Sequence, residues 1–371
     1  MLTTNATSSI PKTHKACVYD RPGSCSIAIQ DVPTPEPAPG EVLVRLTHSG
    51  ICHSDYDIMI NNWSHIPPTQ AGQVGGHEGV GHIVKLAEGT EKVPVKVGDR
   101  VGIKWISEAC LTCPPCTESL EGLCFNQKIS GYSTPGTFQQ YVLGPANYVT
   151  PVPESIPGEL AAPMLCAGVT TYSALRKCGA APGQWIVVSG AGGGLGTVAT
   201  SLATRGMGFR VIGVDMPGKE QTVLDSGAEH FVDATRFDDD DDSIGEEVRR
   251  LTGLGAAAVI VGFQCTGSNR AYGQAVSMLR FGGTVVCVGI PGGERVPIAG
   301  ASALMLIGKE CKVIGSSVGN RREAIETLDI AARGLIEFPV RTVSMGDLQS
   351  VFGDMAQAKI HGRVVLDLTR V

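Results

Sequence analysis

The sequence has 371 residues, of which 43% are hydrophobic and 18% charged, and its formal net charge is -6. This length favours two domains over one, and the composition is ordinary for a soluble globular protein. No run approaches the roughly 20 uninterrupted apolar residues of a membrane span. The acidic balance gives no reason to expect a nucleic-acid partner.

The first ten residues are rich in Ser and Thr and lack a basic region and an apolar core. We therefore expect a disordered extension and no signal peptide, with Asn5-Ala6-Thr7 a chance match to a glycosylation sequon. Six of the twelve cysteines fall into metal-like clusters, and the other six are scattered in apolar surroundings. This usage fits a reducing compartment.

The first 150 residues are predicted to be mostly β. Residues 15–47 alternate in the manner of strands, broken by closely spaced prolines that leave strand edges and loops. The pattern continues at residues 80–86 and 97–104. We expect the chemically active residues in the loops between these strands.

Metal-ligating side chains occur at three separate places: Cys52, His77 and Cys166. Glycines around His77 and Glu78 remove side chains from the approach to an imidazole and a carboxylate. Two thiolates and one imidazole would make a zinc site with one open position, which distinguishes a catalytic zinc from a structural one. A lone His beside Gly is more often an ordinary core or turn residue, so this interpretation depends on the two cysteines.

A second group of cysteines has the spacing C-x2-C-x2-C-x7-C within residues 108–126. Four thiolates at this spacing can surround one tetrahedral zinc with no vacancy, which makes such a site structural. The alternatives are an iron–sulfur cluster and a pair of disulfides. Ferredoxin-like runs place Pro directly after the fourth Cys, whereas Phe125 follows here. The expected ligands of a structural zinc are Cys110, Cys113, Cys116 and Cys124.

From about residue 168, strand and helix patterns alternate. Continuous apolar strands separated by helices of this length indicate a parallel sheet covered on both faces. The expected strands are 185–189, 209–215, 230–233, 256–263 and 283–289. The expected helices are 197–205, 218–226, 243–252 and 269–279.

A glycine-rich loop follows the first of these strands. Such a loop lets backbone N–H groups approach a pyrophosphate at a helix N-terminus. It departs from the G-x-G-x-x-G spacing, because Leu195 stands where the third glycine would fall. Asp215 ends the second strand, where it could accept both ribose hydroxyls of NAD and repel a 2′-phosphate; the alternative is a turn or helix-capping Asp. The loop residues are Gly190, Gly192, Gly193, Gly194, Leu195 and Gly196.

Two later segments complete the chain. The acidic run Asp238–Asp242 resembles a metal site, but adjacent carboxylates repel one another and more often form a solvated loop, so we assign it no function. After Cys311 we expect one amphipathic helix at 321–333. The tail through residues 362–367 is expected to return to the first domain.

These motifs, in this order, resemble the zinc-dependent medium-chain alcohol dehydrogenases over nearly the whole chain. The most similar branch is the tetrameric microbial one, which has the same seven-residue glycine loop. The resemblance rests on Cys52–Asp55, Gly76–Gly81, the four cysteines, Leu165–Gly168, Gly190–Gly196 with Asp215, and Gly315–Arg321. It implies an α/β protein with a mostly-β GroES-like catalytic domain, residues 1–167 and 314–371, and a Rossmann NAD-binding domain, a doubly wound parallel sheet, at residues 168–313.

The resemblance also implies roles around a catalytic zinc. The matching ligands are Cys52, His77 and Cys166, with Glu78 as an alternate ligand. Asp55 matches the group that orients the ligating imidazole, and Ser54 matches the hydroxyl that receives the alcohol proton. Trp63 and Trp105 match two indoles that narrow the substrate pocket.

Cofactor contacts are implied in the same way. The matching residues are His53 and Arg363 at the phosphates, Lys219 near the ribose, Thr170 beside the nicotinamide, and Val288 and Ile290, whose backbone flanks the carboxamide. Together with the glycine loop and Asp215, they imply NAD.

The implied function is an NAD-dependent zinc alcohol dehydrogenase that interconverts a primary alcohol and its aldehyde, with two zinc ions per chain, as a cytoplasmic homotetramer. Zinc can lower the pKa of a bound hydroxyl, and an alkoxide gives up hydride readily. The alternatives are a dehydrogenase or reductase of larger or secondary alcohols in a biosynthetic pathway and a non-catalytic zinc and nucleotide binder. The complete ligand set and Ser54 favour an enzyme, acting on a small-molecule substrate, over the non-catalytic binder. The lack of an apolar span and the acidic balance give no reason to expect a membrane or nucleic-acid partner.

The sequence departs from the family at Asp57. Many relatives carry a His five positions after the first zinc-ligand Cys, and that His takes the proton passed from the hydroxyl through the nicotinamide ribose. A free carboxylate has a pKa near ~3.9 against ~6.5 for imidazole, so it is poorly matched to this task at neutral pH. Asp57 could instead accept a hydrogen bond from the ribose or be a solvated loop residue. We expect the relay to end on water near Asp57.

Overall fold

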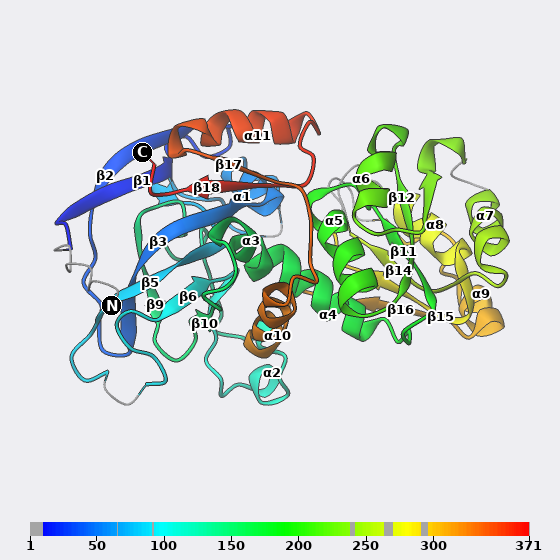
Figure 1. Ribbon diagram of the computed structural model, residues 1–371, viewed down its shortest axis with the longest axis horizontal. Helices are drawn as coiled ribbons and strands as arrows, with labels where there is room; N and C mark the ends of the chain where they lie inside the picture. Colours follow the sequence, from blue (N-terminus) through cyan, green and yellow to red (C-terminus); the bar gives the residue numbers. More distant parts are fainter. Residues whose placement is uncertain are drawn as a thin grey trace.

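Two sheet-containing parts lie side by side along the long axis of the molecule (Figure 1). The computed structural model describes residues 10–64, 66–90, 93–237, 242–262, 270–290 and 296–370. The expected N-terminal extension, apart from Ile10, and the acidic run, apart from Asp242, lie outside these ranges. Among the described residues, no helix combines the length and the apolar character that crossing a membrane needs.

The part that contains both chain ends is mostly β, as predicted. Its seven-stranded sheet has the order β10-β6-β5-β3-β18-β17, and β9 pairs with β3. Within β3, alternation gives way to a nearly continuous buried run, because this strand lies at the centre of the sheet. The strands are β3 (Glu41–Ile51), β5 (Gly79–Leu86), β6 (Arg100–Ile103), β9 (Tyr141–Pro145), β10 (Thr150–Pro151), β17 (Val340–Val343) and β18 (Arg363–Asp367).

Two smaller sheets flank the large one. One has the order β2-β1-β4, and the other pairs β7 with β8 beside the four cysteines. Their strands are β1 (Thr13–Tyr19), β2 (Ile27–Pro33), β4 (Gln73–Val74), β7 (Ile106–Glu108) and β8 (Lys128–Ile129). The short helices nearby are α1 (His53–Met59), α2 (Pro114–Thr117) and the 3-10 turn η1 (Glu121–Leu123).

The C-terminal tail returns to this part, as predicted. Strand β18 pairs antiparallel with β3, with Val364 opposite Ile51. The prediction of a single helix after Cys311 was wrong, because α11 (Leu348–Ala356) follows α10 (Arg321–Ala332). Helix α11 begins after the turn η6 (Met345–Asp347) and packs Leu348, Val351 and Phe352 into the β core.

The other part contains a six-stranded parallel sheet with the order β13-β12-β11-β14-β15-β16. The order reverses at β11, which is the arrangement of a doubly wound sheet. The strands are β11 (Trp185–Ser189), β12 (Arg210–Asp215), β13 (His230–Asp233), β14 (Ala256–Val261), β15 (Leu279–Cys287) and β16 (Lys312–Gly315). Strand β16 runs across the predicted domain boundary at residues 313 and 314.

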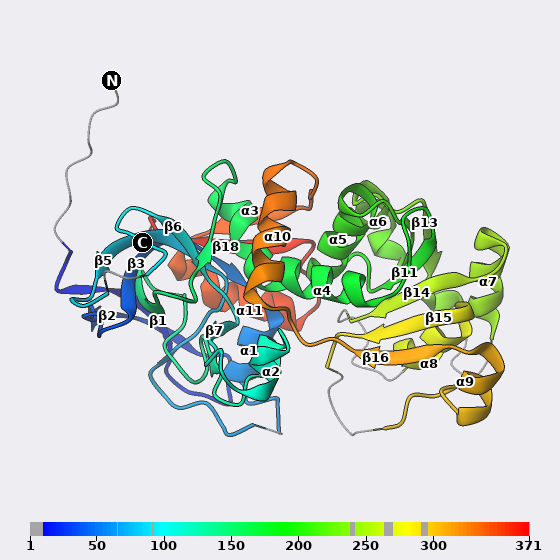
Figure 2. The same ribbon diagram turned by 90° about the horizontal axis from the view of Figure 1, so that it is seen from below.

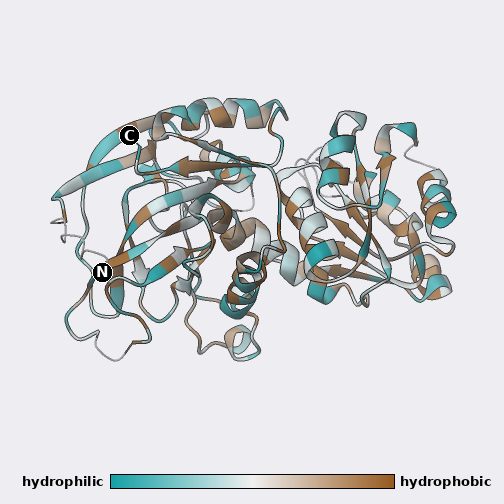
Figure 3. Cartoon of the chain, in the orientation of Figure 1, coloured by the Kyte–Doolittle hydropathy of each residue, from teal (hydrophilic) through white to brown (hydrophobic). Residues whose placement is uncertain are grey.

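Helices cover both faces of this parallel sheet (Figure 2). On β14, Ala258 and Ile260 pack toward the face covered by α4, α5 and α6, whereas Val259 and Val261 pack toward α7 and α8. Burial on both sides explains the continuous apolar strands, which Figure 3 shows as hydrophobic ribbons. The helices are α4 (Val169–Lys177), α5 (Gly194–Ser201), η3 (Leu202–Gly206), η4 (Pro217–Lys219), α6 (Glu220–Asp225), η5 (Ala234–Arg236), α7 (Ser243–Thr252), α8 (Arg270–Ser277) and α9 (Ala303–Lys309).

A helical segment leads from the β part to the parallel sheet. It consists of α3 (Gly158–Pro163), a π-helical turn η2 (Met164–Gly168) and α4. All five residues of η2 are buried, and α10 packs against them. A π-helical turn is uncommon and frequently marks a functional site.

Candidate active site

Four metal-ligating side chains from three distant segments converge in the interior. The ligand atoms of Cys52, His77, Glu78 and Cys166 all lie within 4.8 Å of one another, and all four residues are buried. Cys52 is the N-cap of α1 at the end of β3, and Cys166 lies in η2. His77 and Glu78 directly precede β5. The structure thus brings together the ligand set that the sequence predicted.

The ring of His77 is held by one nitrogen and left open at the other. Its Nδ1 donates to Asp55 Oδ1 at 2.8 Å, and its Nε2 is buried with no hydrogen-bond partner. The same Asp55 carboxylate accepts the backbone N–H of Cys52 at 2.9 Å. A buried polar atom without a partner lowers the stability of the fold by about 1–3 kcal/mol. A metal cation bound at Nε2 would supply the missing partner. The donor set of two thiolates and one imidazole fits zinc.

Glu78 forms a buried ion pair with Arg363, the first residue of β18. Guanidinium Nη2 contacts both carboxylate oxygens, and the two side chains are 0% and 4% exposed. Burial raises the pKa of Glu78 to about 7, whereas the charge of Arg363 acts in the opposite direction. Arg363, which the sequence predicts to contact the cofactor phosphates, is therefore in direct contact with the metal-ligating cluster through Glu78.

Two indoles stand beside this cluster. The ring of Trp105 meets that of His77 edge-on at a centroid distance of 4.8 Å. Trp63 packs against Trp105 in turn, with centroids 6.0 Å apart. Ser54 lies half-buried in the first turn of α1, two residues after Cys52. Of the two predicted pocket walls, Trp105 therefore contacts His77 directly, and Trp63 adjoins it through Trp105.

The glycine loop joins β11 to α5 and leaves no room for a side chain at several of its glycines. A Cβ on Gly196 would come within 2.1 Å of the Gly190 carbonyl oxygen, and Gly190 itself has φ of +78°. Asp215, at the end of β12, accepts the backbone N–H of Gly192 at 2.7 Å. This arrangement leaves a backbone cradle at the N-terminus of α5, which is suited to a phosphate.

The glycine loop also touches the C-terminal tail. A Cβ on Gly194 would lie 3.1 Å from Arg363 Cδ, and Lys219 Nζ donates to the Ile360 carbonyl oxygen at 3.4 Å. The Nε of Arg363 is buried without a hydrogen-bond partner. Arg363 therefore lies between the metal-ligating cluster and the phosphate cradle.

The remaining predicted cofactor residues are dispersed. Thr170 is buried in the first turn of α4, just after η2. Val288 follows β15 and packs beside Gly262, whereas Ile290 is 60% exposed. Within the described ranges, no hydrogen bond joins Thr170, Val288 or Ile290 to the metal-ligating cluster.

Asp57 is neither in a loop nor solvated, so that interpretation of the sequence was wrong. It lies in α1 and is 7% exposed. Its Oδ1 accepts from Asn62 Nδ2 at 2.9 Å and lies 3.6 Å from His53 Nε2. Burial raises the pKa of Asp57, while His53, Asn62 and Trp63 act in the opposite direction.

The four remaining cluster cysteines gather as expected around α2. Their sulfur atoms all lie within 4.8 Å, and the Cys110–Cys124 and Cys113–Cys124 separations are 3.5 and 3.8 Å. Both separations exceed the ~2.05 Å of a disulfide, and no disulfide joins any cysteines of the described ranges. Backbone N–H groups of Cys110 and Asn126 point at the sulfur of Cys124. This is the environment of thiolate ligands.

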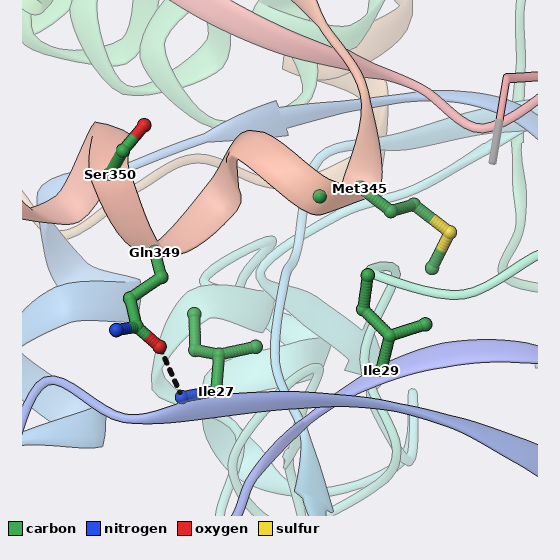
Figure 4. A pocket seen from close by; sticks show the side chains of 6 residues that line it. Ile27, Ile29, Met345, Gln349 and Ser350 are labelled. Carbon is green, nitrogen blue, oxygen red and sulfur yellow. Dashed lines mark hydrogen bonds between the residues drawn. The ribbon is translucent and has the colours of Figure 1, made fainter.

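Two cavities of the described part of the chain lie elsewhere. One of about 410 Å³ separates β2 from α11 and is lined by Ile27, Ile29, Met345, Gly346, Gln349 and Ser350 (Figure 4). None of these six residues carries a titratable group. The other, of about 440 Å³, lies between α10 and the segment of residues 108–126 that holds the four cysteines, called here the four-cysteine lobe. Neither contacts the metal-ligating cluster.

Two residues of the site were not anticipated from the sequence. Tyr19 donates its hydroxyl to the Asp55 carbonyl oxygen at 3.2 Å, and its ring fills the space that a Cβ on Gly75 would need. Asn62 binds Asp57. The contact of Tyr19 with Asp55 joins distant segments that no local pattern relates, so the sequence offered no signal for it. Asn62 lies five residues after Asp57, and its bond depends on how the chain turns beyond the end of α1.

Comparison with known proteins identifies the family. Residues 38–154 match the alcohol dehydrogenase GroES-like domain, and residues 194–333 match the zinc-binding dehydrogenase model. Alcohol dehydrogenase 2 of Emericella nidulans is 57% identical over 98% of this chain and all of that protein. The chain belongs to the zinc-dependent medium-chain alcohol dehydrogenase family. It is accordingly an oxidoreductase of the alcohol dehydrogenase class.

Further relatives and solved structures agree. The alcohol dehydrogenase of Schizosaccharomyces pombe is 38% identical over 98% of this chain and all of that protein. The alcohol dehydrogenase of Aeropyrum pernix superimposes with a TM-score of 0.81 at 28% identity, over 95% of this chain and 99% of that one. An acetophenone reductase from Geotrichum candidum, solved with NAD, has a TM-score of 0.81 at 25% identity, over 98% of this chain and all of that one. The predicted pairing of a GroES-like and a Rossmann part is thereby confirmed.

The Asp55–His77 bond predicts a metal-affinity defect. Replacing Asp55 by Ala should weaken zinc binding at the cluster about 10–100-fold, because the ring loses the partner that fixes its orientation. Chelator competition on the purified protein measures this. The control is Asp31→Ala, which removes an exposed carboxylate paired with Lys15. Unchanged affinity in Asp55→Ala would contradict the assigned role.

Proposed function

We propose that the chain is an NAD-dependent zinc alcohol dehydrogenase that interconverts a primary alcohol and its aldehyde. The observation that carries the proposal is the unpartnered, buried Nε2 of His77 in a four-residue ligand cluster. Arg363 connects this cluster to a backbone cradle suited to a dinucleotide phosphate. Because one arginine contacts both the ligand cluster and the cradle, the arrangement favours an enzyme that transfers hydride over a non-catalytic zinc and nucleotide binder.

The proposed roles follow from the contacts. Cys52, His77 and Cys166 would hold a catalytic zinc with one position open, and Glu78 would be an alternate ligand. Zinc supplies a Lewis acid for the substrate oxygen, and NAD supplies the hydride acceptor. Asp55 keeps the His77 ring in place through its Nδ1. Ser54 takes up the hydroxyl proton of the alcohol.

The cofactor would lie along the tail and the glycine loop. We assign its pyrophosphate to the N–H groups of the loop and to Arg363 and His53. Its adenosine ribose is assigned to Asp215 and Lys219, and its nicotinamide end to Thr170, Val288 and Ile290. The unpartnered Nε of Arg363 supports the phosphate assignment, because a buried guanidinium N–H needs an acceptor.

The assembly and location are proposed from the resemblance. The homotetramer is also supported by exposed apolar side chains on α9, where Leu304 and Ile307 are 83% and 75% exposed, whereas the cytoplasmic location is proposed from the resemblance alone. Helix α9 packs against β15, the neighbour of the edge strand β16. Exposed apolar patches of this kind mark protein interfaces. The domains are proposed to divide near residues 167 and 314.

The indoles predict the substrate range. Trp63 and Trp105 are large rigid walls, so kcat/KM for ethanol should exceed that for a branched or aromatic alcohol by about tenfold or more. A panel of alcohols at one pH, with NAD and with NADP, measures this. Preference for the bulky substrate would favour the alternative, a reductase of larger or secondary alcohols. Ser54, which lacks the methyl group of Thr, would then be the first position to test.

The two ligand clusters predict two zinc ions per chain, one at each cluster and with unequal roles. Cys52→Ser should lose one zinc and the activity while the fold persists. Cys113→Ser should lose the other zinc and lower the thermal unfolding temperature, because a closed four-thiolate site contributes folding energy. Metal analysis and thermal unfolding distinguish the two variants. Full activity with a single zinc in the original protein would refute this assignment.

Asp215 predicts selectivity for NAD. A 2′-phosphate would face a like charge, which costs several kcal/mol, so Asp215→Ala should lower the NAD-to-NADP ratio of kcat/KM at least about tenfold. Part of the loss will fall on NAD itself, since Asp215 also holds the Gly192 N–H. The matched control is Asp233→Asn, at the register partner of Asp215 on β13. Equal use of both cofactors by the original enzyme would exclude this role.

Asp57 predicts an unusual pH profile. We propose that the proton relay ends on water near Asp57, so the kcat profile for alcohol oxidation should lack an imidazole-type ionisation. Asp57→His should introduce one near pH ~6.5, whereas Asp57→Asn should not. Profiles of kcat against pH for the three proteins test this. If the His variant gains no ionisation and keeps its rate, position 57 does not end a working relay.

A further inference from the structure

One carboxylate connects the four-cysteine lobe with the rest of the β part. Glu121 begins η1, three residues before Cys124. Its Oε2 accepts the Tyr148 hydroxyl at 2.9 Å and the backbone N–H of Arg321 at 3.1 Å. Tyr148 is 1% exposed and Glu121 is half-buried, so this charge-assisted contact is partly shielded from water. Nothing in the roles assigned above uses this carboxylate.

The contact with Arg321 fixes the start of α10. Asn320, the N-cap of that helix, donates its side-chain N–H to the Ser119 carbonyl oxygen at 3.0 Å and accepts the Glu323 N–H at 2.8 Å. Glu121 accepts the next helix N–H. A carboxylate at a helix N-terminus is favoured by the helix dipole. The lobe thus holds the N-terminal end of α10, which lies next to α2 in Figure 2.

The other side of α10 packs against the segment that carries Cys166. A Cβ on Gly168, at the end of η2, would approach Thr327 Cγ2 to 2.9 Å. A Cβ on Gly319, just before the helix, would approach Val169 Cγ2 to 2.6 Å. Because packing is this close, a displaced α10 cannot leave η2 and Cys166 unmoved.

A second branch leads from Glu121 to the substrate wall. Lys104 is 3% exposed, and its Nζ lies 3.5 Å from the centroid of the Tyr148 ring. Burial lowers the pKa of Lys104, and the negative charge of Glu121 acts in the opposite direction. The next residue, Trp105, meets the His77 ring. The ammonium, the phenol and the carboxylate thus fix the backbone from which the Trp105 indole projects.

We propose that Glu121 is a positioning residue of the active site, which couples the four-cysteine lobe to Cys166 through α10 and to Trp105 through Tyr148 and Lys104. The four-cysteine lobe then does more than stabilise the fold. Its integrity sets the position of one thiolate ligand and one pocket wall. The inference deepens the proposed function, on which it rests for the identity of the metal site.

The test compares Glu121→Gln with Glu118→Gln, a control at an exposed carboxylate in the same lobe. Cobalt replaces zinc at the Cys52, His77 and Cys166 site, with metal analysis showing that the four-cysteine site keeps its zinc. The readouts are the visible cobalt absorption, the rate of chelator-driven cobalt release well below the unfolding temperature, and KM and kcat. Release and absorption report on the site without alcohol turnover, so a failure of the proposed substrate would be distinguishable.

In Glu121→Gln we expect faster cobalt release by about tenfold, the low end of outer-sphere effects, with a shifted absorption band and a raised KM. Glu118→Gln should match the original protein. Tyr148→Phe, which keeps the ring beneath Lys104 and loses one bond to Glu121, should change release in the same direction by a smaller factor. It serves as the test if Glu121→Gln fails to fold. A lower unfolding temperature with unchanged release, absorption and KM in both variants would overturn the proposal.

Discussion

The buried ion pair between Glu78 and Arg363 is the constraint on which the rest of the structure depends. Removing two charges from water costs several kcal/mol per ion, and only a close, well-oriented partner repays it. Glu78 adjoins His77, a ligand of the proposed catalytic zinc, whereas Arg363 begins the last strand. The pair therefore requires β18 to lie beside β3. The same register carries Gly362 and Arg363 to the glycine loop, so one electrostatic requirement unites the ligand cluster, the tail and the phosphate cradle.

Much of the fold could be predicted because its signals are local. Strands such as β14, which is buried on both faces, appear as unbroken apolar runs. Helix α11 was missed even though Leu348, Val351, Phe352 and Met355 have helical spacing. Nine residues that include Gly353 give too short a window for that periodicity to dominate. The edge of the parallel sheet was also hard to place, since β16 has only four residues, none of them fully buried.

The site was predictable as far as its chemistry lies in residue type. His77 could be recognised as a ligand only together with Cys52 and Cys166, whereas the cysteine spacing alone isolates the second cluster. What could not be predicted were contacts between segments, such as Tyr19 with Asp55 or Glu121 with Arg321. The environment of Asp57 belongs to the same class, because its burial depends on how α1 packs. Such contacts follow from the tertiary arrangement and leave no mark on local composition.

The pairing of β18 with β3 also has a consequence for synthesis. A ribosome releases β3 and the first three metal-ligating side chains long before the residue that neutralises Glu78 emerges. Until then the nascent chain holds an incomplete sheet with open strand edges, which are templates for aggregation. The parallel sheet between them is a continuous stretch of chain and can form earlier. Translation therefore completes the parallel sheet before Arg363 emerges, and a chain that lacks its last nine residues, 363–371, lacks both the partner of Glu78 and the guanidinium beside the glycine loop.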